Sequence, residues 1–167
     1  ADTRTVYATG VGGEGTFRTE DNGNTWKNVT RGGITHPFAD EIVINPHNQS
    51  EIWDVADVGE VFRSIDQGLT WNRIINPYQA GFRYGSIYSL APAPSDANII
   101  YALKNGFGIF KSSNKGEDWQ YLHQSQVDYT YSIAVHPTNP NIVYSGYLPK
   151  PFENWAMVRA YSGEIDQ

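Results

Sequence analysis

Residues 64–71 decide the fold, and they read Ser64-Ile65-Asp66-Gln67-Gly68-Leu69-Thr70-Trp71. The same phrase occurs at residues 19–26, as Thr-Glu-Asp-Asn-Gly-Asn-Thr-Trp, and at residues 112–119, as Ser-Ser-Asn-Lys-Gly-Glu-Asp-Trp. We call these segments the first (19–26), second (64–71) and third (112–119) boxes. Their closing tryptophans are 45 and 48 residues apart, and such a spacing indicates a structural repeat.

Each box has the chemistry of a turn between two strands. The Asp66 carboxylate can accept backbone N–H bonds within the turn, and Gly68 can adopt the positive φ of a tight hairpin. Ser64 offers a second local acceptor, and Trp71 brings a large apolar surface to bury against a neighbouring repeat. Asn114 replaces the aspartate in the third box, keeping the acceptor and losing the charge, which favours a hydrogen-bonding role over catalysis. We therefore expect structural roles for Asp21, Gly23, Trp26, Asp66, Gly68, Trp71, Asn114, Gly116 and Trp119.

Two further strands recur between the boxes. An apolar run that ends near a proline comes first, and a run that contains Trp or Tyr follows a polar turn. With the strands before and after the box, one repeat has four short antiparallel strands, the pattern of a β-propeller blade. The sequence therefore predicts an all-β fold of four-stranded antiparallel blades, and no segment has a sustained helical period. A flat β-sandwich is the alternative.

The repeats predict a single propeller segment of about three and a half blades. The first blade has three strands, and the last has only its opening strands and a tail. The predicted bounds are 4–30, 41–75, 86–123 and 131–167. Propellers close with about four to eight blades, so either the chain is a piece of a longer one, or copies associate. We expect self-association or a second chain that completes the ring.

Composition restricts the function classes. The formal charge is −6 and the pI is near 5.1, which argues against nucleic acid as a partner. Cysteine is absent and the four histidines are scattered, so we expect no disulfide framework, no metal and no cofactor. No stretch is long and apolar enough for a membrane span. An Ala1 start fits a mature exported protein or an excised fragment. The amino-acid composition favours a secreted, extracellular or periplasmic location.

The boxes resemble the Asp-box, S/T-x-D-x-G-x-T-W, of the bacterial neuraminidase repeat. Sialidases, sortilin-type receptors, photosystem II assembly factors and xyloglucanase-type glycoside hydrolases share this motif. The resemblance implies that each box is the turn between the third and fourth strands of a propeller blade. It also implies that the box is a folding device that lies away from the active face.

The opposite face of a propeller gathers the loops between blades and the loops between second and third strands. The loop 76–85 is the strongest candidate for ligand binding, since it holds three aromatic residues and an arginine among glycines. Aromatic faces stack on sugar rings, and arginine can bridge hydroxyls or a carboxylate. The candidate ligand-binding residues are Tyr78, Phe82, Arg83, Tyr84 and, from a later loop, Trp155. The alternative is that these side chains pack over a blade or against a partner.

Asp57 is the candidate catalytic residue. The segment 53–63 resembles Y-A-R-T-D-I-G-G-A-Y-R of xyloglucanase-type hydrolases, in which the aspartate is a catalytic carboxylate. Glycoside hydrolysis needs a second carboxyl roughly 5–10 Å away, and the sequence offers no second match, with Glu14 and Glu60 as weaker candidates. A solvated turn aspartate is the alternative. A sialidase is disfavoured because no R-I-P segment is present.

Two functions remain open. The favoured one is an extracellular propeller module for protein assembly or for ligand or glycan binding, non-catalytic on its own. The other is a segment of a xyloglucanase-like glycoside hydrolase that acts on polysaccharide, with Asp57 as one carboxylate. Whether the chain is an enzyme is left open by the sequence.

Overall fold

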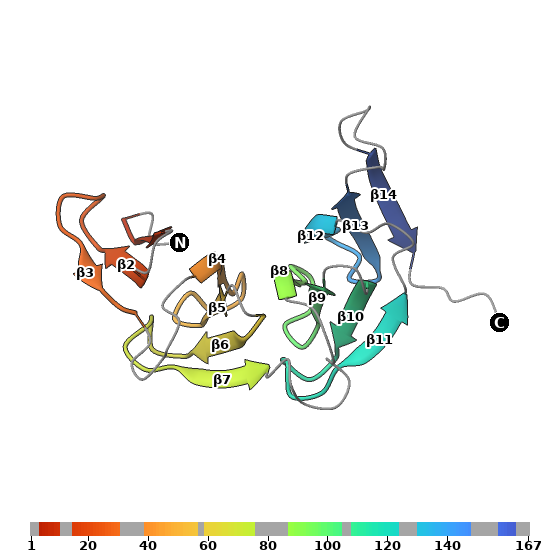
Figure 1. Cartoon of the computed structure of the whole chain (residues 1–167), viewed down its shortest axis with the longest axis horizontal. Coiled ribbons are helices and arrows are strands. Elements are labelled where there is room, and N and C mark those ends of the chain that lie inside the picture. The colour runs from red at the N-terminus through yellow and green to blue at the C-terminus, as the bar shows by residue number, and fades with distance from the viewer. Residues whose placement is uncertain are drawn as a thin grey trace. The chain divides into compact units, whose positions relative to one another are not determined.

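The computed structural model describes residues 4–10, 15–30, 39–56, 59–75, 87–104, 108–123, 130–147 and 157–162. These residues form fourteen strands, and no helix occurs among them. The strands make four antiparallel sheets in which strands that are consecutive in sequence are neighbours (Figure 1). The all-β expectation of antiparallel blades is therefore confirmed.

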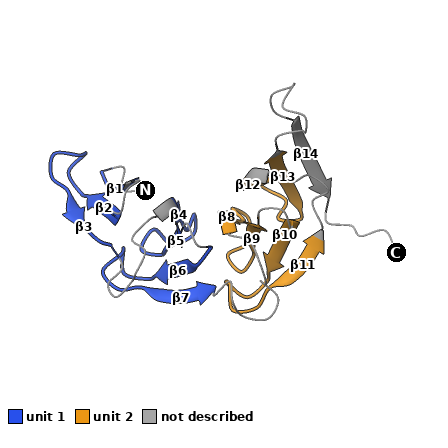
Figure 2. Ribbon diagram, in the orientation of Figure 1, with its two compact units in different colours: residues 1–76 blue, residues 77–167 orange. Residues whose placement is uncertain are grey.

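The chain divides into two compact units, residues 1–76 and 77–167 (Figure 2). The first unit holds two sheets. One contains β1 (Val6–Gly10), β2 (Gly15–Thr19) and β3 (Lys27–Asn28). The other contains β4 (Ala39–Ile44), β5 (Ile52–Ala56), β6 (Val61–Ser64) and β7 (Asn72–Ile75).

The second unit holds the other two sheets. One contains β8 (Ile87–Pro92), β9 (Ile100–Lys104), β10 (Gly108–Ser112) and β11 (Gln120–His123). The other contains β12 (Thr130–Val135), β13 (Ile142–Tyr147) and β14 (Met157–Ser162). The strand β14 pairs along the whole length of β13, so part of the tail forms the third strand of this sheet.

Buried side chains lie between sheets rather than within one. In the second unit, one apolar cluster joins Tyr101 and Leu103 of β9 to Ile133 of β12 and Val143 of β13. The Tyr101 hydroxyl also donates to the Pro140 carbonyl, at 2.7 Å. Neighbouring sheets of this unit therefore pack face to face. Every residue of β5 and of β9 is buried, which explains why both strands read as nearly continuous apolar runs.

The second box is fixed by two side-chain acceptors. Asp66 Oδ1 accepts the Thr70 backbone N–H at 2.8 Å, and Asp66 Oδ2 accepts the Thr70 hydroxyl at 2.6 Å. Ser64 Oγ donates to Asp66 Oδ1 at 2.7 Å and accepts the Gly68 N–H at 2.8 Å. Because Ser64 ends β6 and Thr70 comes just before β7, this network holds the two strands at the hairpin. The first box repeats it with Thr19, Asp21 and Thr25.

Two consecutive residues of each box have positive φ. The values are 59° and 90° at Asn22 and Gly23, 63° and 90° at Gln67 and Gly68, and 61° and 90° at Lys115 and Gly116. Such a pair is typical of a type I′ turn, whose twist matches that of a β-hairpin. The positive φ of the glycine was expected from the sequence. The positive φ of the residue before it was not expected, although asparagine, as in the first box, often adopts this conformation.

The third box exchanges the partners of this network. Asn114 Oδ1 accepts the Asp118 backbone N–H at 2.9 Å, as Asp66 Oδ1 does for Thr70. Asn114 Nδ2 then donates to Asp118 Oδ2 at 2.9 Å. The side-chain bond across the turn is therefore kept with its direction reversed. The expectation that this box loses its charge is incomplete, because the carboxylate has moved to position 118.

Each box is also tied to the turn between the first two strands of its own repeat. The backbone N–H of its left-handed residue donates to a carbonyl of that turn. The bonds run from Gln67 to Ser50 at 2.9 Å and from Lys115 to Asn98 at 2.9 Å, with Asn22 to Arg4 at 3.3 Å as the corresponding bond in the first repeat. The strained residue thus has the same backbone partner in all three repeats.

The second box also contacts the preceding sheet. The Trp71 indole N–H donates to the Val29 carbonyl at 2.9 Å, and a Cβ at Gly68 would lie 3.2 Å from the Val29 side chain. The Arg18 guanidinium donates to the Gln67 side chain. Trp26 and Trp119 instead donate to carbonyls of their own boxes, Gly23 and Gly116, and Trp26 is 44% exposed. In the first unit, the expected burial of a box tryptophan against a neighbouring repeat is thus seen for Trp71.

We expect Asp66→Asn to change the acid sensitivity of the chain. The Thr70 hydroxyl and N–H, together with Ser64, lower the pKa of Asp66 from 3.8 to about 2. The unfolded chain therefore takes up this proton at a higher pH, so the stabilisation is complete above pH ~4 and is lost as the pH falls towards ~2. Urea-unfolding midpoints should decline less steeply over this interval in Asp66→Asn than in the wild type.

The double variant Asp66→Asn/Thr70→Asp copies the third box and should recover the urea-unfolding midpoint of the wild type at pH 7. A midpoint that stays at the value of Asp66→Asn would contradict the exchange of partners described above.

We expect Lys115→Asn to stabilise the chain. Lysine is unfavourable at φ 61°, whereas asparagine tolerates the left-handed region and occupies the matching position, Asn22, of the first box. The free energy of unfolding should rise by roughly 0.5 kcal/mol, as measured by urea denaturation. Glu117→Asn, at an exposed position outside the left-handed region, is the control and should not be stabilising. Equal effects of both substitutions would show that the backbone conformation is not the cause.

Candidate functional site

The residues predicted to bind ligand or to act in catalysis lie outside the described residues. They are Asp57, Tyr78, Phe82, Arg83, Tyr84 and Trp155. Their proposed roles therefore stay predictions. The structure does describe the strand ends that carry these loops, and it describes all nine residues that were assigned to the boxes.

The turn that contains Asp57 is closed by backbone hydrogen bonds on both sides. The Ala56 N–H donates to the Glu60 carbonyl at 2.9 Å, and the Gly59 N–H donates to the Ala56 carbonyl at 2.8 Å. Gly59 has φ 79°, a conformation that favours glycine. A short connection therefore joins the buried strand β5 to β6, with Gly59 and Glu60 as its described residues.

Glu60, at the same turn, is held by an ion pair. Its Oε1 lies 2.7 Å from Arg73 Nη1 on β7, and the Glu60 side chain is only 14% exposed. The pair links the turn after β5 to the outermost strand of the sheet. This geometry gives the carboxylate a structural partner and makes Glu60 a poor choice for the second carboxyl of a hydrolase.

A buried aspartate precedes this turn on β5. Asp54 is 1% exposed, and its Oδ2 accepts the Thr16 hydroxyl of β2 at 3.2 Å. Since β2 and β5 belong to different sheets, this bond joins the first two sheets in their interior. The sequence analysis assigned no role to Asp54. The available signal was a charged residue in the middle of an otherwise apolar strand.

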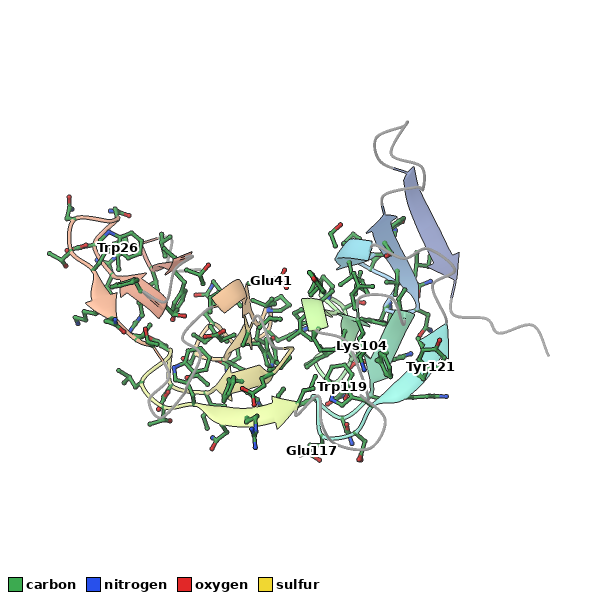
Figure 3. All side chains as sticks on the ribbon, in the orientation of Figure 1. Trp26, Glu41, Lys104, Glu117, Trp119 and Tyr121 are labelled. Carbon is green, nitrogen blue, oxygen red and sulfur yellow. The ribbon has the colours of Figure 1, made fainter. Side chains whose placement is uncertain are left out.

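Lys104 ends β9 at the register that Ala56 occupies in β5. Its side chain is 1% exposed, and burial lowers its pKa from 10.5 to about 8, because the charged amine is penalised away from water. Figure 3 labels Lys104 among the side chains of the second unit. Buried polar side chains therefore lie near the loop ends of both β5 and β9. The sequence analysis did not identify Lys104 as notable.

The charged position on the third strand of each repeat has a structural partner. Arg18 pairs with Glu20 at 2.6 Å and Arg63 with Glu51 at 2.6 Å. Lys111 donates to Asn141 Oδ1, in the next sheet, at 3.0 Å. The Arg18 and Arg63 pairs lie within their own repeats, whereas the Lys111 bond connects its repeat to the turn that precedes β13.

Among the described residues, no group of three or more histidine, aspartate or glutamate side chains could hold a metal ion. Within the same residues, no helix has the length and apolarity of a membrane span.

Comparison with known proteins places the chain in a family. The family model Sortilin-Vps10, described as sortilin and neurotensin receptor 3, matches residues 14–150. Sortilin of Danio rerio is 25% identical over 136 residues, which are 75% of this chain and 16% of that protein. Xyloglucanase Xgh74A of Acetivibrio thermocellus is 30% identical over 105 residues, 57% of this chain and 12% of that protein.

Solved structures share the fold. A crystal structure of an ancestral GH74 enzyme has a TM-score of 0.67 at 24% identity, and the match covers 86% of this chain and 20% of that one. YCF48, solved bound to a D1 peptide, has a TM-score of 0.63 at 18% identity, with 94% of this chain and 52% of that one covered. These likenesses agree with a partial β-propeller.

The relatives are much longer than the region they share with this chain. The chain spans less than a fifth of the length of the sortilin and xyloglucanase that it matches. The family model, in contrast, covers most of the chain. The chain therefore belongs to the Sortilin-Vps10 family.

Proposed function

We propose that the chain is a non-catalytic β-propeller module that binds a ligand through the loops opposite the boxes. The observation that carries this proposal is that the polar groups that recur in each repeat make hydrogen bonds and ion pairs within the fold. The boxes use Asp21, Asp66 and Asn114 to close hairpins, in the manner of structural Asp-boxes. Membership of a family that includes a receptor supports a binding role.

The ligand site is proposed to centre on the loop 76–85. It follows β7 and precedes β8 in the sequence, and it contributes Tyr78, Phe82, Arg83 and Tyr84. We include Trp155 from the segment between β13 and β14. Flat aromatic rings next to a guanidinium suit a glycan, and the xyloglucanase relative favours a polysaccharide over a peptide.

We further propose that another blade covers the first box. Trp71 of the second box reaches the Val29 carbonyl of the preceding sheet, whereas Trp26, at the same position of the first box, is 44% exposed. The partner blade would come from a second copy of the chain, from another chain, or from further repeats of the same protein. A secreted or otherwise extracytoplasmic location would fit this module and its sortilin and xyloglucanase relatives.

Removal of the aromatic loop side chains should abolish glycan binding. We expect the Tyr78→Ala/Phe82→Ala/Tyr84→Ala variant to lose retardation in native gels cast with xyloglucan, and Arg83→Ala and Trp155→Ala to weaken it at least several-fold. Lost stacking surface is the physical reason, at about 1 kcal/mol or more for each ring. Tyr121→Ala, which removes an exposed ring on β11, is the control and should bind as the wild type does. Wild-type migration that does not change with xyloglucan, together with capture of an unstructured peptide library, would redirect the proposal to a peptide ligand.

A glycoside hydrolase is the second candidate function. It is favoured by the 30% identity to a xyloglucanase and by the position of Asp57 directly after the buried strand β5. Asp57 would then be one of two catalytic carboxylates, and the second would come from elsewhere in the complete protein.

The Asp57→Asn variant distinguishes the two candidates. If the chain is a binding module, neither the wild type nor Asp57→Asn releases reducing ends from xyloglucan, and both bind it equally. If it is a hydrolase, the wild type releases reducing ends and Asp57→Asn loses at least about 10²-fold in rate, because a general acid–base contribution has been removed. Asp66→Asn is the matched control, since it changes a box carboxylate that we place outside the ligand-binding face.

A further inference from the structure

A hollow of about 280 Å³ lies beside the third box. It is lined by Lys111, Ser113, Asn114, Asp118, Trp119 and Gln120. All six residues belong to the second unit. Figure 3 labels Trp119 and Glu117 on this box, and Glu117 is exposed without lining the hollow.

The hollow lies at a position where the three boxes differ in sequence. Where the third box has Ser113, the first has Glu20 and the second has Ile65. The Glu20 carboxylate bridges two cations, with one oxygen 2.6 Å from Arg18 and the other 3.2 Å from Lys27. In the first repeat a side chain of the protein itself therefore occupies the corresponding space.

The third repeat keeps the walls and lacks the bridging group. Lys111 and Gln120 correspond to Arg18 and Lys27, and they face each other across β10 and β11. The Ser113 side chain is too short to reach between them as Glu20 does. Within the described residues, no hydrogen bond engages the side chains of Ser113 or Gln120. Oxygen atoms of a guest molecule can take the place of the missing carboxylate.

The walls are held in position before any ligand arrives. Lys111 Nζ is 3.0 Å from Asn141 Oδ1 and 5.7 Å from the centre of the Tyr101 ring. The Trp119 indole N–H is fixed on the Gly116 carbonyl at 3.0 Å. Prearranged side chains reduce the entropy cost of binding.

The chemistry of the walls specifies an uncharged, hydroxylated ring. Lys111 and Asp118 carry opposite charges, so the hollow has no net charge for an ion to neutralise. Gln120 and Ser113 offer both donors and acceptors, and Trp119 supplies an apolar surface. The volume suits one ring rather than an extended chain, since it lies just below that of common ligand pockets.

We propose that this hollow is a binding site for a single hexopyranose unit, made by residues other than those of the proposed loop site, and its role rests on the proposed glycan-binding function. The ring lies against Trp119, and its hydroxyls bridge Lys111 and Gln120 in the place that Glu20 fills in the first repeat. The site is small and open, so the affinity is low, and it acts by adding a second contact to a polysaccharide that the loops also hold.

Two substitutions copied from the other boxes test the proposal. Ser113→Glu restores the residue of the first box and should pair with Lys111, and Ser113→Ile restores that of the second. Saturation-transfer NMR and titration of the indole N–H signals with methyl β-D-glucopyranoside should show binding to the wild type. Both variants should lose at least about tenfold in affinity, because the space is filled. Glu117→Gln is the control in the same box and should bind as the wild type does.

Two results would overturn the proposal. One is that the wild type does not bind the glucoside, and the other is that the wild type and a folded Ser113→Ile variant bind it equally. Binding of glucuronate without binding of the neutral glucoside would show a site for anions instead. The loop variant Tyr78→Ala/Phe82→Ala/Tyr84→Ala should retain the monosaccharide signal. Failure of the loop proposal and failure of this one are therefore distinguishable.

Discussion

A side-chain oxygen that bridges the end of one strand and the start of the next holds each hairpin of this structure. In the second box, Asp66 binds both the backbone and the side chain of Thr70 and receives the hydroxyl of Ser64. The turn that it stabilises requires two consecutive residues of positive φ, an unfavourable arrangement for a side chain such as that of Gln67 or Lys115. The local network therefore offsets a strained backbone. The left-handed conformation directs the backbone N–H of that residue to a carbonyl in the adjacent turn of its own repeat.

Packing between repeats depends on the same turn being correctly placed. Gly68 and Trp71 rest against Val29, while Tyr7 and Arg18 reach Gln67 from the preceding sheet. In the interior, Thr16 and Asp54 join the same two sheets through a buried hydrogen bond. A shift of the second box would therefore disturb surface and interior contacts between sheets together. This coupling is a physical reason for the recurrence of the motif that does not depend on ligand binding.

The architecture was predictable from the sequence because its determinants are local and repeated. Strand runs, proline-ended segments and box turns recur at nearly constant spacing, so each copy supports the interpretation of the others. The left-handed residue before glycine was missed because glutamine and lysine are residue types that do not indicate a positive φ. Asp54 and Lys104 were missed because their significance comes from burial between strands that are distant in sequence. The roles of Asp57 and of the aromatic loop stay predictions, since they concern residues beyond those that the structure describes.

The exchange of partners in the third box bears on how such repeats diverge. Asn114 and Asp118 there do together what Asp66 and Thr70 do in the second box, so neither position has a residue requirement of its own. Each position considered alone looks variable, although the hydrogen bonds across the turn are kept. Within this chain the residues at the two positions change together, so a box is recognised better by the pair than by either position alone.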